Sequence, residues 1–144
     1  MHKKLVTLKQ VDELKIEKER LLHSATHEEI LSGATTDIYF VKTHEILQHH
    51  GLGDTEVTAE VFARGDGILA GMEEVIQLLT KGIDPDRPLE LWALEEGAPF
   101  KSKDVLLRIK GRYLDFGIYE TALLGMLASA SGWATAAREV KTIA

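Results

Sequence analysis

An acid and an aromatic ring lie two positions apart in the stretch "TTDIYF", where a helix is predicted to begin. The simpler interpretation is that Asp37 caps the first turn of this helix and that Tyr39 is a half-buried aromatic residue. The alternative is that a ring and a carboxylate, displayed together at a helix start, hold a flat heteroaromatic ligand. From these residues alone the simpler interpretation is favoured.

The stretch "YETALLGMLASASGWATAAREVKTIA" (119–144) is apolar and rich in small residues. Small residues at helical spacing let another element approach closely, so this segment is predicted to lie between two layers of protein. Two of its few charged side chains are Glu120 and Arg138. Arg138 could contact an anion or only complement Glu139 and Asp115, and both interpretations stay open.

Three histidines, at 44, 49 and 50, lie near the end of the helix predicted over 37–50. His44 and His49 are five positions apart and do not share a face as metal ligands four apart would. Solvated histidines, favoured there by the helix dipole, are the preferred interpretation over a metal site. The glycines of "GDGILAG" (65–71) lack the context of a dinucleotide or phosphate loop. No catalytic residue and no metal ligand is therefore predicted.

The composition is that of one globular domain. The chain has 144 residues, 44% hydrophobic and 28% charged, with a formal net charge of −6 and no cysteine. Disulfides and thiolate metal sites are excluded, and an acidic balance argues against nucleic-acid binding. No segment has the run of apolar residues that a membrane span or a signal peptide needs, so we expect a cytoplasmic location.

Local patterns predict an α+β domain with helices on one face of a small, largely antiparallel sheet. A capping box at Thr26 and Glu29 opens a short turn that ends at Gly33. In the helix over 37–50, three apolar residues are expected on one face: Ile38, Val41 and Ile46.

Alternation of apolar and polar residues predicts a strand over 55–65. The remaining elements are a short helix over 11–22, a glycine turn with a short strand over 65–71, a helix over 72–82, strands over 89–97 and 104–113, and a terminal helix from about 118 to 142 that "SASG" could break. We divide the chain into an extension with a capping turn (1–35), a sandwich domain (36–130) and the start of a link to another domain (131–144).

Taken in order, "TTDIYF", "AEVFARGDGILAGMEEVIQLL", "LEEGAPFKSKDVLLRIKGRY" and "YETALLGMLASASGWATAA" resemble the N-terminal portion of the nicotinate and quinolinate phosphoribosyltransferases, most closely the nicotinate enzymes. The resemblance covers roughly residues 26 to 144. It implies an α/β-hammerhead-like sandwich domain of the type II phosphoribosyltransferases, with a C-terminal helix leading toward an α/β barrel that this sequence lacks.

The resemblance also implies a function. Such enzymes are glycosyltransferases that join nicotinate and phosphoribosyl pyrophosphate (PRPP) to give nicotinate mononucleotide for NAD biosynthesis. The nicotinate enzymes use Mg²⁺ and couple the reaction to ATP hydrolysis, so they are also classed as ligases. They work as head-to-tail dimers. The residues for PRPP and the phosphorylated histidine belong to the barrel, so we expect this chain to be inactive alone.

Four residues match or depart from the family's pattern. Asp37 and Tyr39 match an Asp-x-Tyr motif that such enzymes place near the pyridine ring of the substrate, with the tyrosine stacking on that ring from the neighbouring subunit. Glu120 stands where the quinolinate enzymes have an arginine that reaches the substrate's carboxylates. A glutamate there would repel a second carboxylate, which favours nicotinate. Arg138 is kept as an anion contact.

Three other interpretations stay in play. One is a fragment of a quinolinate phosphoribosyltransferase. Another is a non-catalytic hammerhead module like the biotinyl and lipoyl carriers, in which Lys101 or Lys103 would be modified, although no Met-Lys pair stands at a hairpin tip. The third is a free-standing oligomerisation domain, since the terminal helix would otherwise leave apolar surface uncovered.

Overall fold

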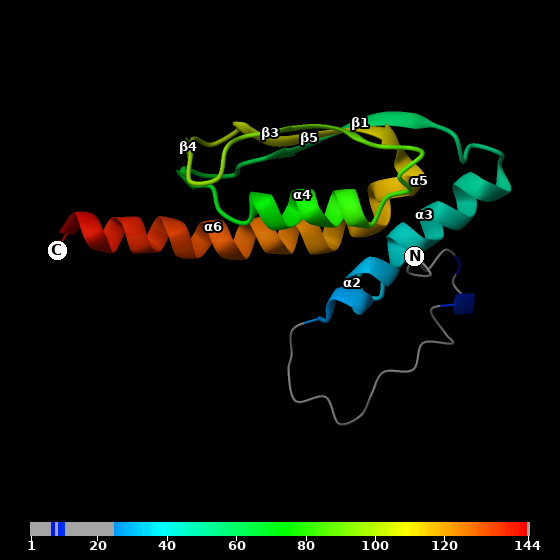
Figure 1. Cartoon of the computed structure of the whole chain (residues 1–144), viewed down its shortest axis with the longest axis horizontal. Coiled ribbons are helices and arrows are strands. Elements are labelled where there is room, and N and C mark those ends of the chain that lie inside the picture. Colours follow the sequence, from blue (N-terminus) through cyan, green and yellow to red (C-terminus); the bar gives the residue numbers. More distant parts are fainter. Residues whose placement is uncertain (1–6, 8, 11–24, 144) are drawn as a thin grey trace, which may run out of the picture.

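The domain has two layers, a sheet and a pair of helices that cover one of its faces (Figure 1). The computed structural model describes residues 7, 9–10 and 25–143, so the helix predicted over 11–22 lies outside the described residues. The elements are α2 (His27–Ser32), α3 (Ile38–His49), β1 (Glu56–Phe62), β2 (Gly67–Ile68), α4 (Met72–Lys81), β3 (Glu90–Ala93), β4 (Pro99–Phe100), β5 (Val105–Arg112), α5 (Tyr113–Phe116), the 3₁₀ turn η1 (Gly117–Tyr119) and α6 (Glu120–Ile143).

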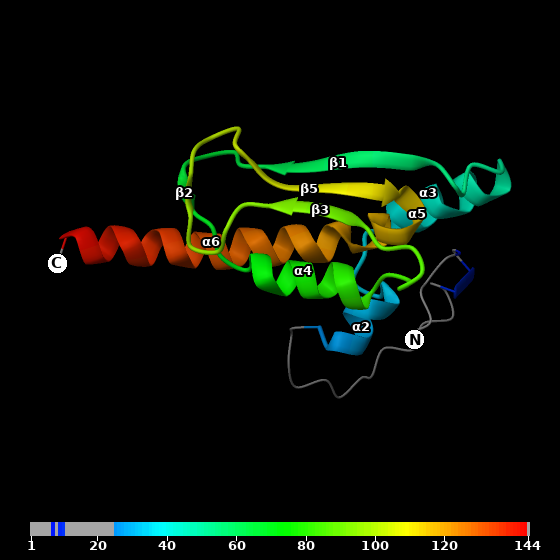
Figure 2. The same cartoon turned by 45° about the horizontal axis from the view of Figure 1, so that its top comes forward.

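The main sheet is antiparallel throughout, in the order β1-β5-β3. Burial alternates residue by residue along β1, as its apolar-polar alternation predicts. Arg108, in the central strand, faces Glu60 on one side and Trp92 on the other. One face of the sheet packs on α4 and α6, which lie beneath it in Figure 2. The core between these layers includes Leu79, Leu107 and Leu123, all of them buried.

The segment "GDGILAG" is attached to α6 by side-chain hydroxyls. The backbone N–H of Ile68 donates to Thr135 Oγ1 at 2.9 Å, and that of Ala70 donates to Ser131 Oγ at 3.1 Å. A Cβ on Gly67 would lie 2.8 Å from Thr135 Oγ1. The same Cβ would lie 2.7 Å from Cζ of Phe100, so glycine lets the backbone pass close to both side chains, as the sequence pattern predicts. The short strand β4, which pairs with β2, was not predicted.

Helix α4 is amphipathic, and its N-terminus is capped by a carboxylate that is distant in the sequence. Glu96, in the loop after β3, accepts hydrogen bonds from the backbone N–H groups of Gly71, Met72 and Glu73 at 2.7, 2.7 and 3.3 Å. A carboxylate at this end satisfies N–H groups that have no partner within the helix and complements the helix dipole. The predicted helix over 72–82 is confirmed, ending at Gly82.

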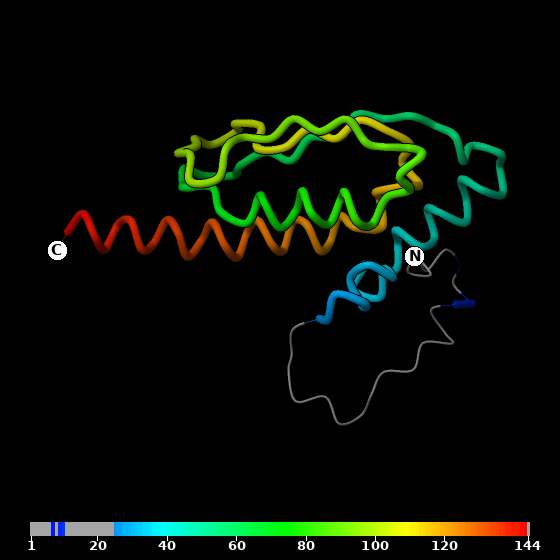
Figure 3. The backbone as a smooth tube through the Cα atoms, viewed as in Figure 1, coloured from blue at the N-terminus to red at the C-terminus, as the bar shows by residue number. Residues whose placement is uncertain are grey.

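The C-terminal third is helical from Tyr113 onward, in three joined pieces. The predicted strand over 104–113 ends one residue early, and α6 begins at Glu120 after η1. No break occurs at "SASG", and α6 runs without interruption to Ile143, beyond the edge of the sheet (Figure 3). Tyr119 is fully buried, and its hydroxyl lies 3.0 Å from the carbonyl oxygen of Leu31 and 3.1 Å from that of Gly82.

Helix α3 differs from its predicted packing. Ile38 and Ile46 are 47% and 57% exposed, whereas Phe40, Val41 and His44 are buried. The expectation of one apolar face through Ile38, Val41 and Ile46 was therefore wrong. Among the described elements α3 packs against η1, and its buried residues are Phe40, Val41 and His44.

The capping box at Thr26 and Glu29 is confirmed, with both reciprocal hydrogen bonds present and Gly33 in the left-handed region after α2. Among the residues that the structure describes, no helix is both long and apolar enough to cross a membrane.

Candidate functional site

The beginnings of α3 and α6 are joined through Asp37 and Thr121. The backbone N–H of Asp37 donates to Thr121 Oγ1 at 3.1 Å, and the Thr121 hydroxyl donates to Asp37 Oδ2 at 3.2 Å. Asp37 occupies the N-cap position of α3, but its side chain makes no capping hydrogen bond, so its predicted capping role is corrected. Thr121 therefore orients the Asp37 carboxylate.

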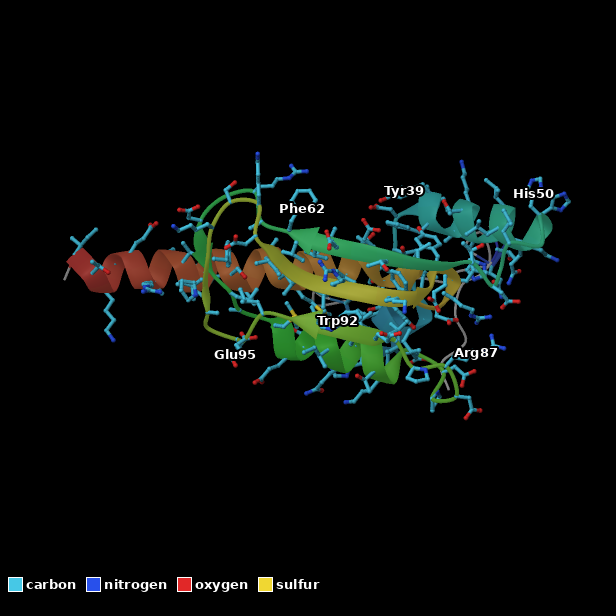
Figure 4. All side chains as sticks on the ribbon, turned by 90° about the horizontal axis from the view of Figure 1, so that it is seen from above. Tyr39, His50, Phe62, Arg87, Trp92 and Glu95 are labelled. Atoms are coloured by element: carbon cyan, nitrogen blue, oxygen red, sulfur yellow. The ribbon has the colours of Figure 1, made fainter. Side chains whose placement is uncertain are left out.

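Tyr39 lies in the first turn of α3 with 53% of its surface exposed, and Figure 4 shows it at the surface beside that helix. Its ring is tilted against that of Phe40, with 4.0 Å between ring centroids. The pKa of the Tyr39 phenol is raised, first by partial desolvation and then by the negative charges of Glu120 and Asp37. Both carboxylates therefore lie close enough to the ring to act on it electrostatically.

Glu120 is the first residue of α6 and is half-buried, and burial raises the pKa of its carboxyl group. Tyr113 stands beside it. The pKa of the Tyr113 phenol is raised by burial and then by the proximity of Glu120 and Tyr39. A Cβ on Gly117 would lie 2.7 Å from Cζ of Tyr113, so the missing side chain makes room for this ring.

Asp37, Tyr39, Tyr113 and Glu120 thus form one group, which we call the acidic–aromatic cluster. Sequence reasoning missed Tyr113, because the residue ends a predicted strand and carries no motif of its own. In the described part of the chain, neither Asp37 nor Glu120 takes part in an ion pair. The cluster combines two carboxylates and two phenols, so it can hold a ring by its face and attracts positive charge.

Arg138 lies far from this cluster. It is eighteen residues after Glu120 on a continuous helix, which at 1.5 Å per residue places the two about 27 Å apart. It does not pair with Asp115, because Asp115 forms two hydrogen bonds of 2.6 and 2.9 Å with the guanidinium of Arg112. Arg138 instead borders an open depression of about 780 Å³, together with Lys101 and Glu139.

A groove of about 930 Å³ runs between β1 and α6, with Glu120 among its lining residues. Its walls are largely apolar, with contributions from Val61, Leu124 and Leu127. Of the four residues singled out from sequence, only Glu120 lines this groove. It therefore connects the acidic–aromatic cluster with the apolar surface of the helix layer.

The histidines of α3 do not behave alike. His49 and His50 are exposed, with edge-to-face rings 5.2 Å apart, in accord with their predicted position in the last turn. His44 is buried, so the expectation that all three are solvated was wrong for this residue. Within residues 7, 9–10 and 25–143, no three metal-ligating side chains converge.

Comparison with known proteins defines the class. The chain is a small mixed α/β domain with a long C-terminal helix, the architecture of the N-terminal domain of type II phosphoribosyltransferases. The model of the family "Quinolinate phosphoribosyl transferase, N-terminal domain" matches residues 37–131. The chain belongs to this family.

Two solved structures are similar to it. One is the nicotinate-nucleotide pyrophosphorylase from Pyrococcus furiosus, with 39% identity, a TM-score of 0.66, and coverage of 75% of this chain and 28% of that one. The other is human nicotinic acid phosphoribosyltransferase, with 21% identity, a TM-score of 0.66 and the same coverages, which shows the fold alone. The chain thus spans little more than a quarter of the length of these structures.

Proposed function

We propose that this chain is the N-terminal domain of a nicotinate phosphoribosyltransferase, the enzyme that joins nicotinate and PRPP to give nicotinate mononucleotide for NAD biosynthesis. The observation that carries the proposal is the convergence of Asp37 and Tyr39 with Glu120, which follows them in the sequence by more than 80 residues. These are the residues expected to face the pyridine ring. In this proposal Tyr39 stacks on the ring and Thr121 holds Asp37 in place.

The choice of nicotinate over quinolinate rests on Glu120. Its carboxyl group is half-buried and has no cationic partner among the described residues, so it cannot accept a second substrate carboxylate without an uncompensated repulsion. The family match fits a quinolinate phosphoribosyltransferase as well, and that enzyme is the alternative.

The proposal includes a homo-oligomer, and the position of Arg138 supports it. Within one chain, about 27 Å of helix separates Arg138 from Glu120. If Arg138 and the acidic–aromatic cluster contact the same nicotinate molecule, Arg138 must therefore belong to one copy of the chain and the cluster to another. We therefore propose a head-to-tail dimer in which the Arg138 end of one copy approaches the cluster of the other. A separate barrel domain or second chain would supply the rest of the site.

PRPP, Mg²⁺ and ATP belong to the same proposal, for the whole enzyme only. The described residues do not fit a resident Mg²⁺, since no three carboxylate or histidine side chains converge. We assign no step of the reaction to a metal or to ATP within this chain. Its own residues orient the pyridine ring and exclude a second carboxylate.

The test is formation of nicotinate mononucleotide from nicotinate, PRPP, Mg²⁺ and ATP. We expect no turnover by the chain alone and turnover after the portion of the Pyrococcus furiosus protein that this chain does not cover is added. In that mixture Glu120→Gln should lower activity with nicotinate, while Glu95→Gln, in a distant loop, should not. Glu120→Arg should move the preference toward quinolinate. Turnover by the chain alone, or a preference for quinolinate before any substitution, would contradict the proposal.

A further inference from the structure

The two edges of the main sheet differ in how they are protected against further strands. The edge strand β3 is short, running only from Glu90 to Ala93, and Pro88 stands two residues before it. The other edge strand, β1, has seven residues from Glu56 to Phe62, with no proline or lysine among them. Short length, proline and lysine are common devices that keep an edge strand from pairing with another strand. The edge formed by β1 uses none of these three.

The backbone of β1 presents a row of hydrogen-bonding groups along this edge. Just before the strand, the carbonyl oxygen of Thr55 accepts from the backbone N–H of Tyr113, and just after it the N–H of Ala63 donates to β5's preceding loop. Because bonded and outward positions alternate along an antiparallel strand, the odd-numbered residues of β1 bond to β5 and the even-numbered ones face outward. Among the described residues β1 pairs with β5 alone, so these outward groups have no strand partner.

The apolar groove of about 930 Å³ lies directly along this edge, between β1 and α6. On its α6 side Leu124 is 40% exposed, and Ala128 and Gly132 follow at intervals of about one helical turn. A Cβ placed on Gly132 would have nothing within 4 Å. Glycine inside a helix is less stable than alanine, and no close contact in the described part of the chain accounts for this one. The groove therefore has room for side chains that this chain does not supply.

The edge and the groove together restrict what covers them. A second copy paired through its own β1 would satisfy the backbone groups, but its inward side chains are Val57, Ala59 and Val61, which are too small to fill the groove. A helix would fill the groove, but its backbone groups bond within the helix and leave the edge of β1 unpaired. An extended strand with large apolar side chains at alternate positions satisfies both.

We propose that the groove is filled by a β-strand of the polypeptide that this chain does not cover, which pairs with β1 and directs alternate apolar side chains toward Leu124 and Gly132. That polypeptide is large, since the chain covers only 28% of the Pyrococcus furiosus protein. The strand adds a fourth member to a sheet of three and fastens this domain to the rest of the enzyme. The inference rests on the proposed function in one respect only, that the chain works as part of a larger enzyme.

The experiment measures amide hydrogen exchange along β1 by NMR, in the full chain alone and after the uncovered portion of the Pyrococcus furiosus protein is added. In the free chain the outward amides of Thr58, Glu60 and Phe62 should exchange quickly, while those of Ala59 and Val61, bonded to β5, exchange slowly. In the mixture we expect exchange at the three outward amides to slow by about tenfold or more. This selective change distinguishes an added strand from a helix or a surface that only covers the edge.

Variants test the edge and the groove separately. Thr58→Pro removes an outward N–H without breaking a bond to β5, and it should weaken association of the two portions about tenfold. Its control is Ala93→Pro, at an outward position of the other edge, because the neighbouring N–H of Leu94 donates to Leu106 of β5. This control should leave the affinity unchanged. Gly132→Phe fills the groove from α6 and should also weaken association. An amide spectrum of each variant confirms that it is folded.

Three results would overturn the inference. One is association without slower exchange at the outward amides, and another is no association at all. The third is protection that rises with the concentration of the chain alone, which would make a second copy the occupant. Turnover of nicotinate in a mixture whose outward amides still exchange quickly would refute the added strand and leave the proposed function intact. Protected amides without turnover would support the strand and count against that function.

Discussion

The buried hydroxyl of Tyr119 is predicted to stabilise the fold at neutral pH and to destabilise it at strongly alkaline pH. It lies within hydrogen-bonding distance of two carbonyl oxygens, those of Leu31 and Gly82, and so joins α2, α4 and the turn before α6. Tyr119→Phe removes that donor from a fully buried place. At neutral pH we expect a loss of about 1–2 kcal/mol in the free energy of unfolding, because buried carbonyl groups lose their partner.

At alkaline pH the wild-type protein should become less stable than Tyr119→Phe. Burial raises the pKa of the Tyr119 phenol from 10.0 to about 12. A proton that the folded state holds more tightly stabilises the protein fully below pH 10, and this contribution is lost as the pH rises toward 12. This difference in the pKa of Tyr119 between the unfolded and folded states corresponds to about 2.7 kcal/mol of stability, which the wild-type protein should lose and Tyr119→Phe should not.

The assay is urea unfolding followed by circular dichroism at several pH values between neutrality and pH 12. The difference between wild type and Tyr119→Phe should shrink above pH 10 and change sign near pH 12. Tyr39→Phe, at an exposed hydroxyl, is the control at neutral pH and should change stability by less than about 0.5 kcal/mol. A difference between Tyr119→Phe and wild type that stays constant with pH would refute the assignment of the shift to Tyr119.

Three further predictions concern α6 and α4. Thr135→Val should cost about 1–3 kcal/mol because it leaves a backbone N–H of β2 without its acceptor, whereas Thr142→Val, whose hydroxyl bonds only within its own helix, should cost less in the same urea titration. Gly125→Ala should stabilise the isolated chain by about 0.5–1 kcal/mol, since nothing lies within 4 Å of the new Cβ, while Gly82→Ala should destabilise it through a clash at 2.7 Å with Tyr119. Glu96→Ala should lower the melting temperature and weaken hydrogen-exchange protection at the start of α4, and unchanged protection there would contradict the capping role.

Features that depend on neighbours in the sequence were predictable. The capping box at Thr26 and Glu29, the alternation along β1 and the end of α4 at Gly82 each follow from a few adjacent residues, and all are confirmed. The close backbone approach at Gly67 was also readable, because glycines around a short apolar run have few other uses.

Features that depend on partners distant in the sequence could not be predicted. Asp37 was expected to cap α3, but its carboxylate bonds to Thr121, 84 residues away. Nothing beside Tyr113 in the sequence indicates that its ring approaches Tyr39 and Glu120. The burial of His44 depends on how α3 packs against the rest of the domain, which no local pattern fixes. The proposed division at residues 35 and 130 stays a prediction.

The central strand of the main sheet is the last strand of the chain. Because β5 separates β1 from β3, neither of them has a neighbour in this sheet until β5 begins at Val105, and Glu56 at the start of β1 pairs only with Arg112 at the end of β5. The apolar face of α4 likewise stays uncovered until α6 has been synthesised. A growing chain on the ribosome would therefore carry the half-buried side of β1 uncovered for most of its synthesis, a state in which chains aggregate or engage chaperones. Folding of this domain should be late and largely all-or-none, and it should be slower than its small size suggests.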